Sequence, residues 1–277
     1  MKDGFIRVAA ATPDIHVADP QYNSEQIIEL MEQGSTRGVK VMAFPELCLT
    51  AYTCSDLFLQ ESLLREAKKE LKRILQASKS KDMILFVGMP WMHKGKLYNV
   101  AAVLNRGRIL GIVPKKHLPN YSEFYELRHF NPGMEKVEMT DWEGVQVPMG
   151  MNLLFACRTM PELVLAAELC EDVWVPCPPS ISHALAGATV IANCSASDET
   201  TGKDQYRYNL ICGQSARLVC GYIYANAEKG SHPRIWYLAD RISLRKTAPV
   251  WYSLTGLKMP ASVQIWILEG IISEPAV

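Results

Sequence analysis

Three side chains that can do chemistry each follow a stretch of sequence that predicts a buried strand. They are Glu46 after the apolar run 39–44, Lys115 after the run 109–113, and Cys170 after the run 163–169. In α/β folds, functional sites assemble at the carboxyl ends of strands. This placement makes the carboxylate, the ammonium group and the thiol candidates for a single site, although they are far apart along the chain.

A thiol, a cation and a carboxylate form a coherent set for nucleophilic catalysis. The carboxylate can take the proton of the thiol and later pass it to a leaving amine. The lysine cation lowers the pKa of the thiol and can stabilise the oxyanion of a tetrahedral intermediate. A thioester then divides amide hydrolysis into two easier steps. The residue types therefore predict cysteine-dependent hydrolysis of an amide.

A structural interpretation of each residue stands beside this one. A glutamate or lysine after a strand usually faces solvent, and a lone cysteine usually packs in the core. None of the eight cysteines forms a C-x-x-C pair or lies at zinc-finger spacing from histidines, so a disulfide framework is not expected. His117 and His129 lie near Lys115. A metal site is one interpretation of them, and loop histidines that pack against neighbours are the favoured one, with no metal expected.

The elements that must position these residues are predicted by hydropathy. Short apolar runs alternate with amphipathic segments, which is typical of an α/β domain. The predicted strands are residues 6–11, 39–44, 83–89, 97–104, 109–113, 153–156, 163–169, 189–192 and 221–227. The predicted helices are residues 25–37, 55–79 with Ser55 as N-cap, 203–220, and a short piece between the strands 153–156 and 163–169.

The composition is that of an ordinary globular protein, with 48% hydrophobic and 21% charged residues in a chain of 277. Lys+Arg and Asp+Glu balance at 29 each, so neither a polycation for nucleic acid nor an acidic tail stands out. The N-terminus carries no cleavable signal pattern, and no apolar run approaches the roughly 20 residues that a membrane span needs. We expect a cytoplasmic protein with no nucleic-acid or membrane partner.

Three motifs resemble those of a known superfamily. FPELCLTAY is similar to the glutamate motif of the nitrilase superfamily of carbon–nitrogen hydrolases, VPKKHLPNYSEFYELRHFNPG to its lysine motif, and ELCEDVWVP to its cysteine motif. They occur in the order and at the approximate spacing of the superfamily. The stretches LPNYSEFYE, C-E-D-x-W-x-P and NCSASDETTGKDQYRYNL resemble the glutaminase domain of glutamine-dependent NAD synthetases in particular. The resemblance runs over residues 5–230.

Matched position by position, the motifs imply roles for seven residues. Glu46 is the general base, Cys170 is the nucleophile, Lys115 is the motif lysine because it fits P-K-x-[HY]-L, Glu126 is an additional carboxylate, and Tyr121, Ser197 and Lys203 contact the substrate. For the last three, ordinary positions are the alternative: Tyr121 and Ser197 in loops, and Lys203 on the surface of the first turn of a helix.

The resemblance also implies a fold, a reaction and partners. The fold is a four-layer α-β-β-α sandwich, and the reaction is hydrolysis of the side-chain amide of L-glutamine to glutamate and ammonia, without a cofactor. In the complete enzymes, a second domain uses ATP and this ammonia to make NAD, and the chains form homo-oligomers. Two alternatives remain: an amidase of the superfamily that acts alone on another small amide, and an inactive remnant that only binds or assembles.

The sequence changes character after Gly230. Residues 231–277 hold three of the six tryptophans and lack clean strand or helix periodicity, and they stop resembling the family. Codons can be chosen for three stretches of this tail so that a reading frame shifted one base earlier encodes QDLVFGG, QNLIAENG and DRFENA. These three peptides resemble the family's next strands. The tail is therefore predicted to be a frameshift product, with the synthetase domain absent. A divergent but genuine tail is the alternative.

The altered tail has a physical consequence. We expect the C-terminal strands of the fold to be missing, which leaves unpaired strand edges and exposed apolar surface. The predicted domains are thus a nitrilase-type domain over residues 1–230 and an aberrant tail over 231–277. We expect a chain that keeps its catalytic residues but folds poorly or aggregates.

Overall fold

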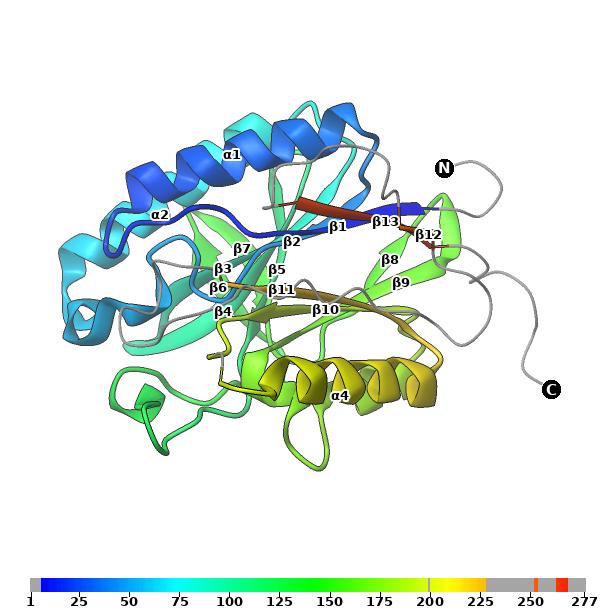
Figure 1. Ribbon diagram of the computed structural model, residues 1–277. Coiled ribbons are helices and arrows are strands. Elements are labelled where there is room, and N and C mark those ends of the chain that lie inside the picture. The colour runs from blue at the N-terminus through cyan, green and yellow to red at the C-terminus, as the bar shows by residue number, and fades with distance from the viewer. Residues whose placement is uncertain (1–5, 199, 228–251, 254–262, 269–277) are drawn as a thin grey trace.

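Two β-sheets form the centre of the protein in a computed structural model that describes residues 6–198, 200–227, 252–253 and 263–268 (Figure 1). The nine-stranded sheet has the order β12 (Tyr252–Ser253), β13 (Val263–Leu268), β1 (Ile6–Ala11), β2 (Val41–Ala43), β3 (Ile84–His93), β4 (Lys96–Asn105), β5 (Arg108–Pro114), β7 (Val145–Met149) and β6 (Glu138–Trp142). The four-stranded sheet has the order β11 (Gly221–Asn226), β10 (Val190–Ser195), β9 (Met160–Leu169) and β8 (Phe155–Cys157).

The helices lie outside the two sheets. The α-helices are α1 (Pro20–Thr36), α2 (Glu61–Ser78), α3 (Pro179–Leu185) and α4 (Lys203–Leu218), and the 3-10 helices are η1 (Tyr52–Leu59), η2 (Glu126–Arg128) and η3 (Cys170–Val173). Figure 1 shows α1 and α2 on the outer side of the nine-stranded sheet and α4 on the outer side of the four-stranded sheet. This is the four-layer α-β-β-α sandwich that the family resemblance implies.

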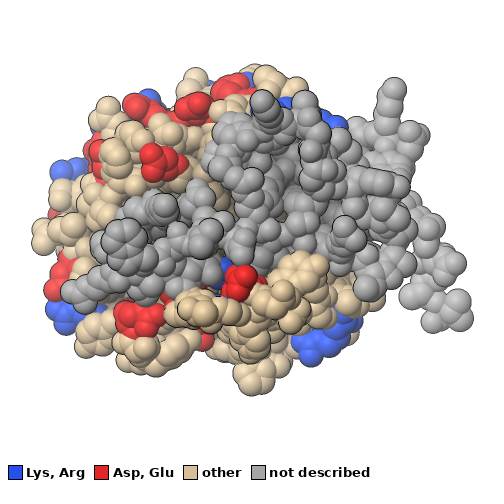
Figure 2. Space-filling model, in the orientation of Figure 1, with Lys and Arg blue, Asp and Glu red and all other residues tan. Residues whose placement is uncertain are grey.

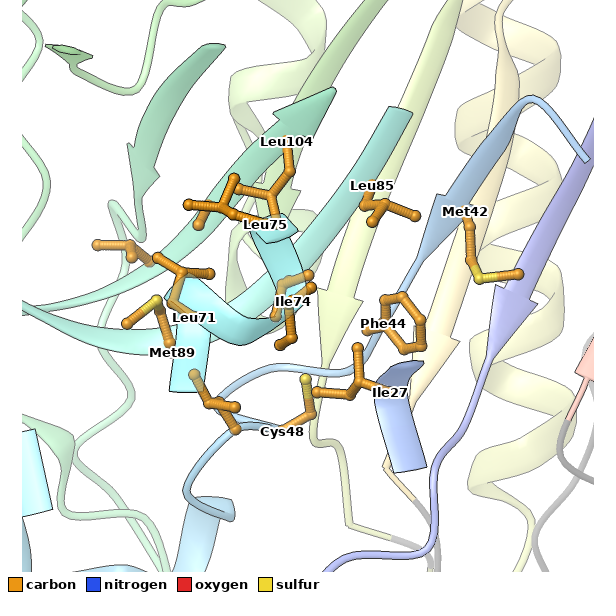
Figure 3. Close-up of a cluster of buried hydrophobic side chains, with 14 of the residues drawn as sticks. Ile27, Met42, Phe44, Cys48, Leu71, Ile74, Leu75, Leu85, Met89 and Leu104 are labelled. Carbon is orange, nitrogen blue, oxygen red and sulfur yellow. The ribbon is translucent and has the colours of Figure 1, made fainter. Parts of the chain in front are cut away.

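A separate hydrophobic cluster fills each of the three interfaces between layers. In the first, Ile27 of α1 and Ile74 of α2 share a cluster with Leu85 of β3 and with Phe44, which directly follows β2 (Figure 3). A second cluster lies between the two sheets, and a third lies between the four-stranded sheet and α4. Burial of apolar surface on both faces of both sheets is what stabilises the stack.

Strand β9 serves two of these interfaces at once. Leu165, Ala167 and Leu169 join the cluster between the sheets, whereas Ala166 joins the cluster under α4. Successive side chains of a strand point to opposite faces, so a strand buried on both faces is mostly apolar, and the one buried carboxylate near the end of β9, Glu168, accepts hydrogen bonds from Ser180 and Tyr222. The largely apolar sequence before Cys170 therefore follows from the layered fold.

The helix predicted over residues 55–79 is two elements instead of one. Ser55 has a φ of +51° inside η1, and α2 begins only after Gln60. Ser55 is therefore not the N-cap of the long helix. Phe58 of η1 packs with Leu63 in the first turn of α2, whereas Leu71 and Ile74 further along α2 belong to a different cluster.

The segment from 153 to 169 is a β-hairpin, without the helical piece that we expected. Cys157 of β8 pairs with Met160 of β9 across a tight turn. The sequence also did not predict α3 or the hairpin of β6 and β7, whose turn residues Glu143 and Gly144 both have positive φ. These elements are short and half polar, so periodicity alone gave little signal.

Most of the tail lies outside the described residues, and the frameshift hypothesis therefore stays a prediction. Two strands of the tail are described, however. Strand β13 runs antiparallel to β1, with Ile6 opposite Leu268 and Ala11 opposite Val263. The expectation that C-terminal strands are missing is thus corrected for these residues. Strand pairing uses backbone groups, so the tail pairs with β1 without needing particular side chains.

The surface charge, the helix hydropathy and the state of the cysteines can each be compared with the expectations from the sequence. Acidic and basic side chains are interspersed on the face in Figure 2, consistent with the balanced composition. None of the helices in the described part of the chain is long and apolar enough to cross a membrane. All eight cysteines are free thiols, so no disulfide joins the layers.

Candidate active site

Lys115 lies between two buried carboxylates. It follows β5, its side chain is inaccessible to solvent, and its Nζ donates to Oε1 of Glu46 and to Oε1 of Glu126, at 2.6 Å in both cases. Glu46 follows β2 and Glu126 begins η2. The structure therefore brings together three of the four residues that the sequence predicts to be catalytic.

Two opposing effects act on the pKa of Lys115. Burial lowers it, but the negative charges of Glu126 and Glu46 raise it more, so that the pKa is well above its usual value. Burial also raises the pKa of Glu126, which the positive charge of Lys115 opposes. Lys115 is therefore a permanent cation at neutral pH, able to stabilise negative charge beside it.

Both carboxylate oxygens of Glu46 are held. Oε1 accepts from the amide of Asn99 at 2.6 Å in addition to Lys115, and Oε2 accepts the N–H of Ala196 at 3.1 Å. The backbone N–H of Glu46 donates to the carbonyl of Ser195 at 3.3 Å. Ser195 ends β10, so these bonds fasten the glutamate to the second sheet.

The loop that carries Glu46 crosses β3 at Gly88. A Cβ atom at this position would lie 2.2 Å from the carbonyl oxygen of Pro45 and 2.5 Å from the backbone nitrogen of Leu47, which is closer than such atoms can approach. The carbonyl of Gly88 accepts the N–H of Leu49 at 3.2 Å. The missing side chain at Gly88 therefore lets the glutamate loop lie directly on the strand.

Cys170 is the first residue after β9 and has a φ of +40°, a conformation that disfavours a side chain. Its backbone N–H donates to Oδ1 of Asn193 at 3.1 Å. Burial and the negative charge of Glu46 raise the pKa of its thiol, and the positive charge of Lys115 opposes that rise. The resting residue is thus a neutral thiol that lies within the electrostatic influence of a carboxylate and a cation.

Cys170 lines a cavity of about 410 Å³, a size found for small-molecule sites. The three residues predicted to contact substrate line the same cavity: Tyr121, Ser197 and Lys203. Aromatic rings form much of the rest of its wall, from Phe124, Trp174 and Tyr206. Predicted nucleophile and predicted substrate contacts therefore meet in one space.

Tyr121 and Lys203 each pair with an acidic residue. The hydroxyl of Tyr121 donates to the carboxylate of Glu171 at 3.0 Å, and burial together with the charge of Glu171 raises the pKa of Tyr121 to about 12. Lys203 is the first residue of α4 and forms an ion pair with Asp198. Tyr121, Glu171 and Lys203 line the cavity, so it presents hydrogen-bond donors and one carboxylate.

Ser197 is held from two sides. Its backbone N–H donates to Oδ1 of Asn226 at 2.8 Å, and its hydroxyl accepts from the buried guanidinium of Arg207 at 3.4 Å. Asn226 ends β11 and Arg207 lies on α4, so the loop after β10 is fixed to two neighbouring elements. Ser197 is therefore not an unrestrained loop residue.

The sequence did not point to four buried or half-buried polar residues that contact the predicted catalytic residues or the backbone beside them. Tyr52 donates to Glu126 at 2.6 Å, and the amide of Asn99 donates to Glu46 and, at 3.4 Å, to Glu126. Asn193 and Asp172 accept backbone N–H groups of the cysteine loop. Asn99 and Asn193 interrupt apolar runs, and a buried polar residue in such a run is the signal that identifies them.

The histidines considered as metal ligands have other neighbours. Nε2 of His129 lies 3.0 Å from Oδ1 of Asp56, and the backbone N–H of His117 donates to Asp172. Within the described ranges, no three His, Cys, Asp or Glu residues are grouped so that they can hold a metal ion.

Comparison with known proteins places the chain among hydrolases. Residues 7–231 match the model of the carbon-nitrogen hydrolase family. The chain is 41% identical over 227 residues to the glutamine-dependent NAD(+) synthetase of Mycobacterium tuberculosis, which is 82% of this chain and 33% of that protein. The protein of the same name from Aquifex aeolicus is 31% identical over 226 residues, 82% of this chain and 36% of its own length. The chain thus spans about a third of these relatives.

Solved structures agree with this comparison. A glutamine-dependent NAD(+) synthetase from Cytophaga hutchinsonii matches with a TM-score of 0.73 at 29% identity, over 81% of this chain and 36% of that chain. An amidase from Nesterenkonia sp. matches with a TM-score of 0.63 at 19% identity, over 82% of this chain and 78% of that chain. The second likeness shows the fold alone.

Proposed function

The chain belongs to the carbon–nitrogen hydrolase family, and from that premise we propose that it hydrolyses the side-chain amide of L-glutamine to glutamate and ammonia. One observation carries the proposal. Nζ of Lys115 lies 2.6 Å from both Glu46 and Glu126, and the charges of Lys115 and Glu46 act on the thiol of Cys170, which lines the cavity. A nucleophile that lines a cavity, together with a buried base and a fixed cation whose charges act on its thiol, suffices for thioester chemistry.

In the acylation step, the sulfur of Cys170 forms a bond to the amide carbon, and its proton passes to the carboxylate of Glu46. Charge that develops on the carbonyl oxygen is stabilised by the ammonium of Lys115. When the intermediate collapses, the carbon–nitrogen bond breaks and the nitrogen takes the proton from Glu46. Ammonia leaves, and a glutamyl thioester remains on Cys170.

In the deacylation step, water attacks the thioester carbon and Glu46 accepts the proton of that water. The carbon–sulfur bond then breaks, the sulfur takes the proton back and glutamate is released. Water is consumed and ammonia is produced once per cycle, so the chain ends in its starting state. Glu126 acts in this scheme through Lys115, whose ammonium it holds in place.

The choice of glutamine rests on the cavity and on the relatives. Tyr121, Ser197 and Lys203 line the cavity together with the carboxylate of Glu171. A cation and an anion at one site suit the carboxylate and ammonium groups of an amino acid. The relatives from Mycobacterium tuberculosis and Aquifex aeolicus are named as glutamine-dependent.

The proposal extends to the use of the product. In a complete NAD synthetase, the ammonia made here would be passed to the ATP-dependent synthetase part. Because the chain spans about a third of such relatives, that step belongs to sequence beyond the family match. The homo-oligomer and the cytoplasmic location inferred from the sequence remain predictions.

Trapping the thioester tests the proposal. The chain is incubated with L-glutamine and quenched in acid, the peptide that contains Cys170 is analysed by mass spectrometry, and released ammonia is measured. We expect a glutamyl adduct on Cys170 and ammonia release that falls to background in C170A. The matched control is C177A, because Cys177 is an exposed free thiol that does not line the cavity.

Three outcomes contradict the proposal in different ways. Unchanged ammonia release from C170A removes Cys170 from the chemistry. Ammonia release from other small amides but not from glutamine identifies a stand-alone amidase. A cooperatively folded chain with no turnover of any amide identifies a remnant.

A further inference from the structure

Asp172 joins two segments that come from different sheets. Its Oδ1 accepts the N–H of His117 at 2.8 Å, and its Oδ2 accepts the N–H of Leu169 at 3.1 Å and that of Lys116 at 3.4 Å. Lys116 and His117 follow β5 of the nine-stranded sheet, whereas Leu169 ends β9 of the four-stranded sheet. One carboxylate therefore bridges the backbone beside Lys115 and the backbone beside Cys170.

Each bridged segment is also anchored to its own sheet. The N–H of Lys115 donates to the carbonyl of Asn99 in β4 at 2.9 Å. The N–H of Cys170 donates to the side chain of Asn193 in β10 at 3.1 Å. These anchors fix each segment within its sheet, but they do not fix one segment relative to the other.

Asp172 supplies that relative placement from a buried position. The residue is 1% exposed, so its hydrogen bonds do not compete with solvent. A second link between the segments runs from Tyr121 to Glu171, but Tyr121 is 56% exposed. Of these two links, the hydrogen bonds of Asp172 are therefore the better protected from solvent.

We propose that Asp172 is a positioning residue that sets the separation between the ammonium of Lys115 and the sulfur of Cys170. The effect of a charge on a neighbouring group falls with distance. A longer separation weakens the influence of Lys115 on the thiol, and it also moves the cation away from the carbonyl oxygen of the substrate. The second consequence rests on the proposed function, whereas the first does not.

A carboxylate suits this position better than an amide of the same shape. All three backbone groups that Asp172 meets are donors, and only a carboxylate offers acceptors on both oxygens. In D172N, an NH₂ group replaces one oxygen. This NH₂ group faces at least one of the backbone N–H donors and cannot accept a hydrogen bond from it. The substitution therefore loosens the bridge while it preserves the volume of the side chain.

The test compares D172N with the wild-type chain in two assays. In the first, kcat and KM are measured for ammonia release from glutamine. We expect kcat to fall by about 10²-fold, the effect of a small misplacement of a reacting group, with KM nearly unchanged. In the second, the alkylation rate of Cys170 by iodoacetamide is followed against pH by peptide mass spectrometry. We expect the apparent pKa of this thiol to rise in D172N.

The matched control is E70Q. Glu70 is also 1% exposed, and its carboxylate accepts from the hydroxyl of Ser24 at 2.5 Å, but it lies where α1 and α2 meet and not in the candidate site. We expect E70Q to leave both assays at wild-type values. A D172N chain with wild-type kcat and a wild-type alkylation profile overturns the proposal. If the wild-type chain does not hydrolyse glutamine, the proposed function fails, and the alkylation profile still decides the role of Asp172.

A measurement on the wild-type chain covers the case in which D172N does not fold. Hydrogen exchange of the backbone amides of Lys116 and His117 is followed by mass spectrometry at pH 8. Buried amides bonded to a carboxylate exchange slowly, so we expect strong protection. Exchange at the rate of an unstructured loop overturns the proposal.

Discussion

Nζ of Lys115 lies 2.6 Å from Oε1 of Glu46, and neither side chain is exposed to solvent. Glu126 holds the same ammonium from another side, also at 2.6 Å. A buried ion pair contributes little net stability when intact, but it leaves an uncompensated charge when one partner is removed. The charges to which we assign the proposed chemistry therefore also depend on one another for burial, and the loss of one leaves the others uncompensated.

The first prediction concerns that ion pair. K115M leaves the carboxylates of Glu46 and Glu126 buried without their cation, so we expect the free energy of unfolding to fall by about 3–5 kcal/mol. Denaturation by urea measures this loss. The control is K116M, because Lys116 is half-buried and pairs with the exposed Glu135 at 3.2 Å. Such a surface pair contributes at most about 1 kcal/mol, and equal losses in the two variants would contradict the prediction.

The second prediction concerns Asn99, whose amide donates to both Glu46 and Glu126. In N99A, both carboxylates lose a donor. A hydrogen bond to a charged group contributes about 1.5–3 kcal/mol, which corresponds to about a 10- to 100-fold fall in kcat if the bond orients the base. Steady-state ammonia release from glutamine measures it. N105A is the control, since Asn105 ends the same strand and its side-chain amide donates to the carbonyl of Met83, away from the candidate site. A wild-type kcat in N99A would show that Glu46 is oriented without Asn99.

The third prediction concerns pH and Asp172. Burial raises the pKa of its carboxyl to about 7, the charge of Glu168 acts in the same direction, and the N–H groups of His117 and Leu169 and the charge of Lys115 oppose the rise. In the unfolded chain the group titrates near 3.9. The folded state thus binds the proton more tightly, so the contribution of Asp172 to stability is greatest below about pH 4 and is lost as the pH rises to about 7.

The measurement is the free energy of unfolding of the wild-type chain minus that of D172N, taken at pH 5 and pH 8. We expect this difference to be smaller at pH 8, because the wild-type chain then buries an ionised carboxylate that the variant lacks. The other titrating groups are present in both chains, so their contributions largely cancel in the difference. A difference that grows between pH 5 and pH 8 contradicts the assigned direction of the pKa.

The sequence predicted the ends of the strands better than the supports of the site. Glu46, Lys115 and Cys170 follow apolar runs, and burial of both sheet faces makes such runs easy to detect. The roles of Asn99 and Asp172 depend on contacts between β4 and the loop after β2, and between the loops after β5 and β9. Spacing along the chain carries no information on such contacts. Ser55 failed as an N-cap because tertiary packing of η1 overrode a local preference.

The fourth prediction concerns the tail, most of which lies outside the described residues. If residues 231–277 arise from a shifted reading frame, the encoding DNA, read one base earlier, contains QDLVFGG opposite Pro233 to Asp240, followed by QNLIAENG and DRFENA. Codon degeneracy allows these readings but does not require them, so finding all three in the DNA is a demanding test. Sequencing that DNA is the measurement. The frameshift is rejected if the alternative frame of the codons for residues 233–260 gives early stop codons or unrelated residues. The tail is then a divergent but genuine sequence, and the pairing of its strand β13 with β1 belongs to the native fold.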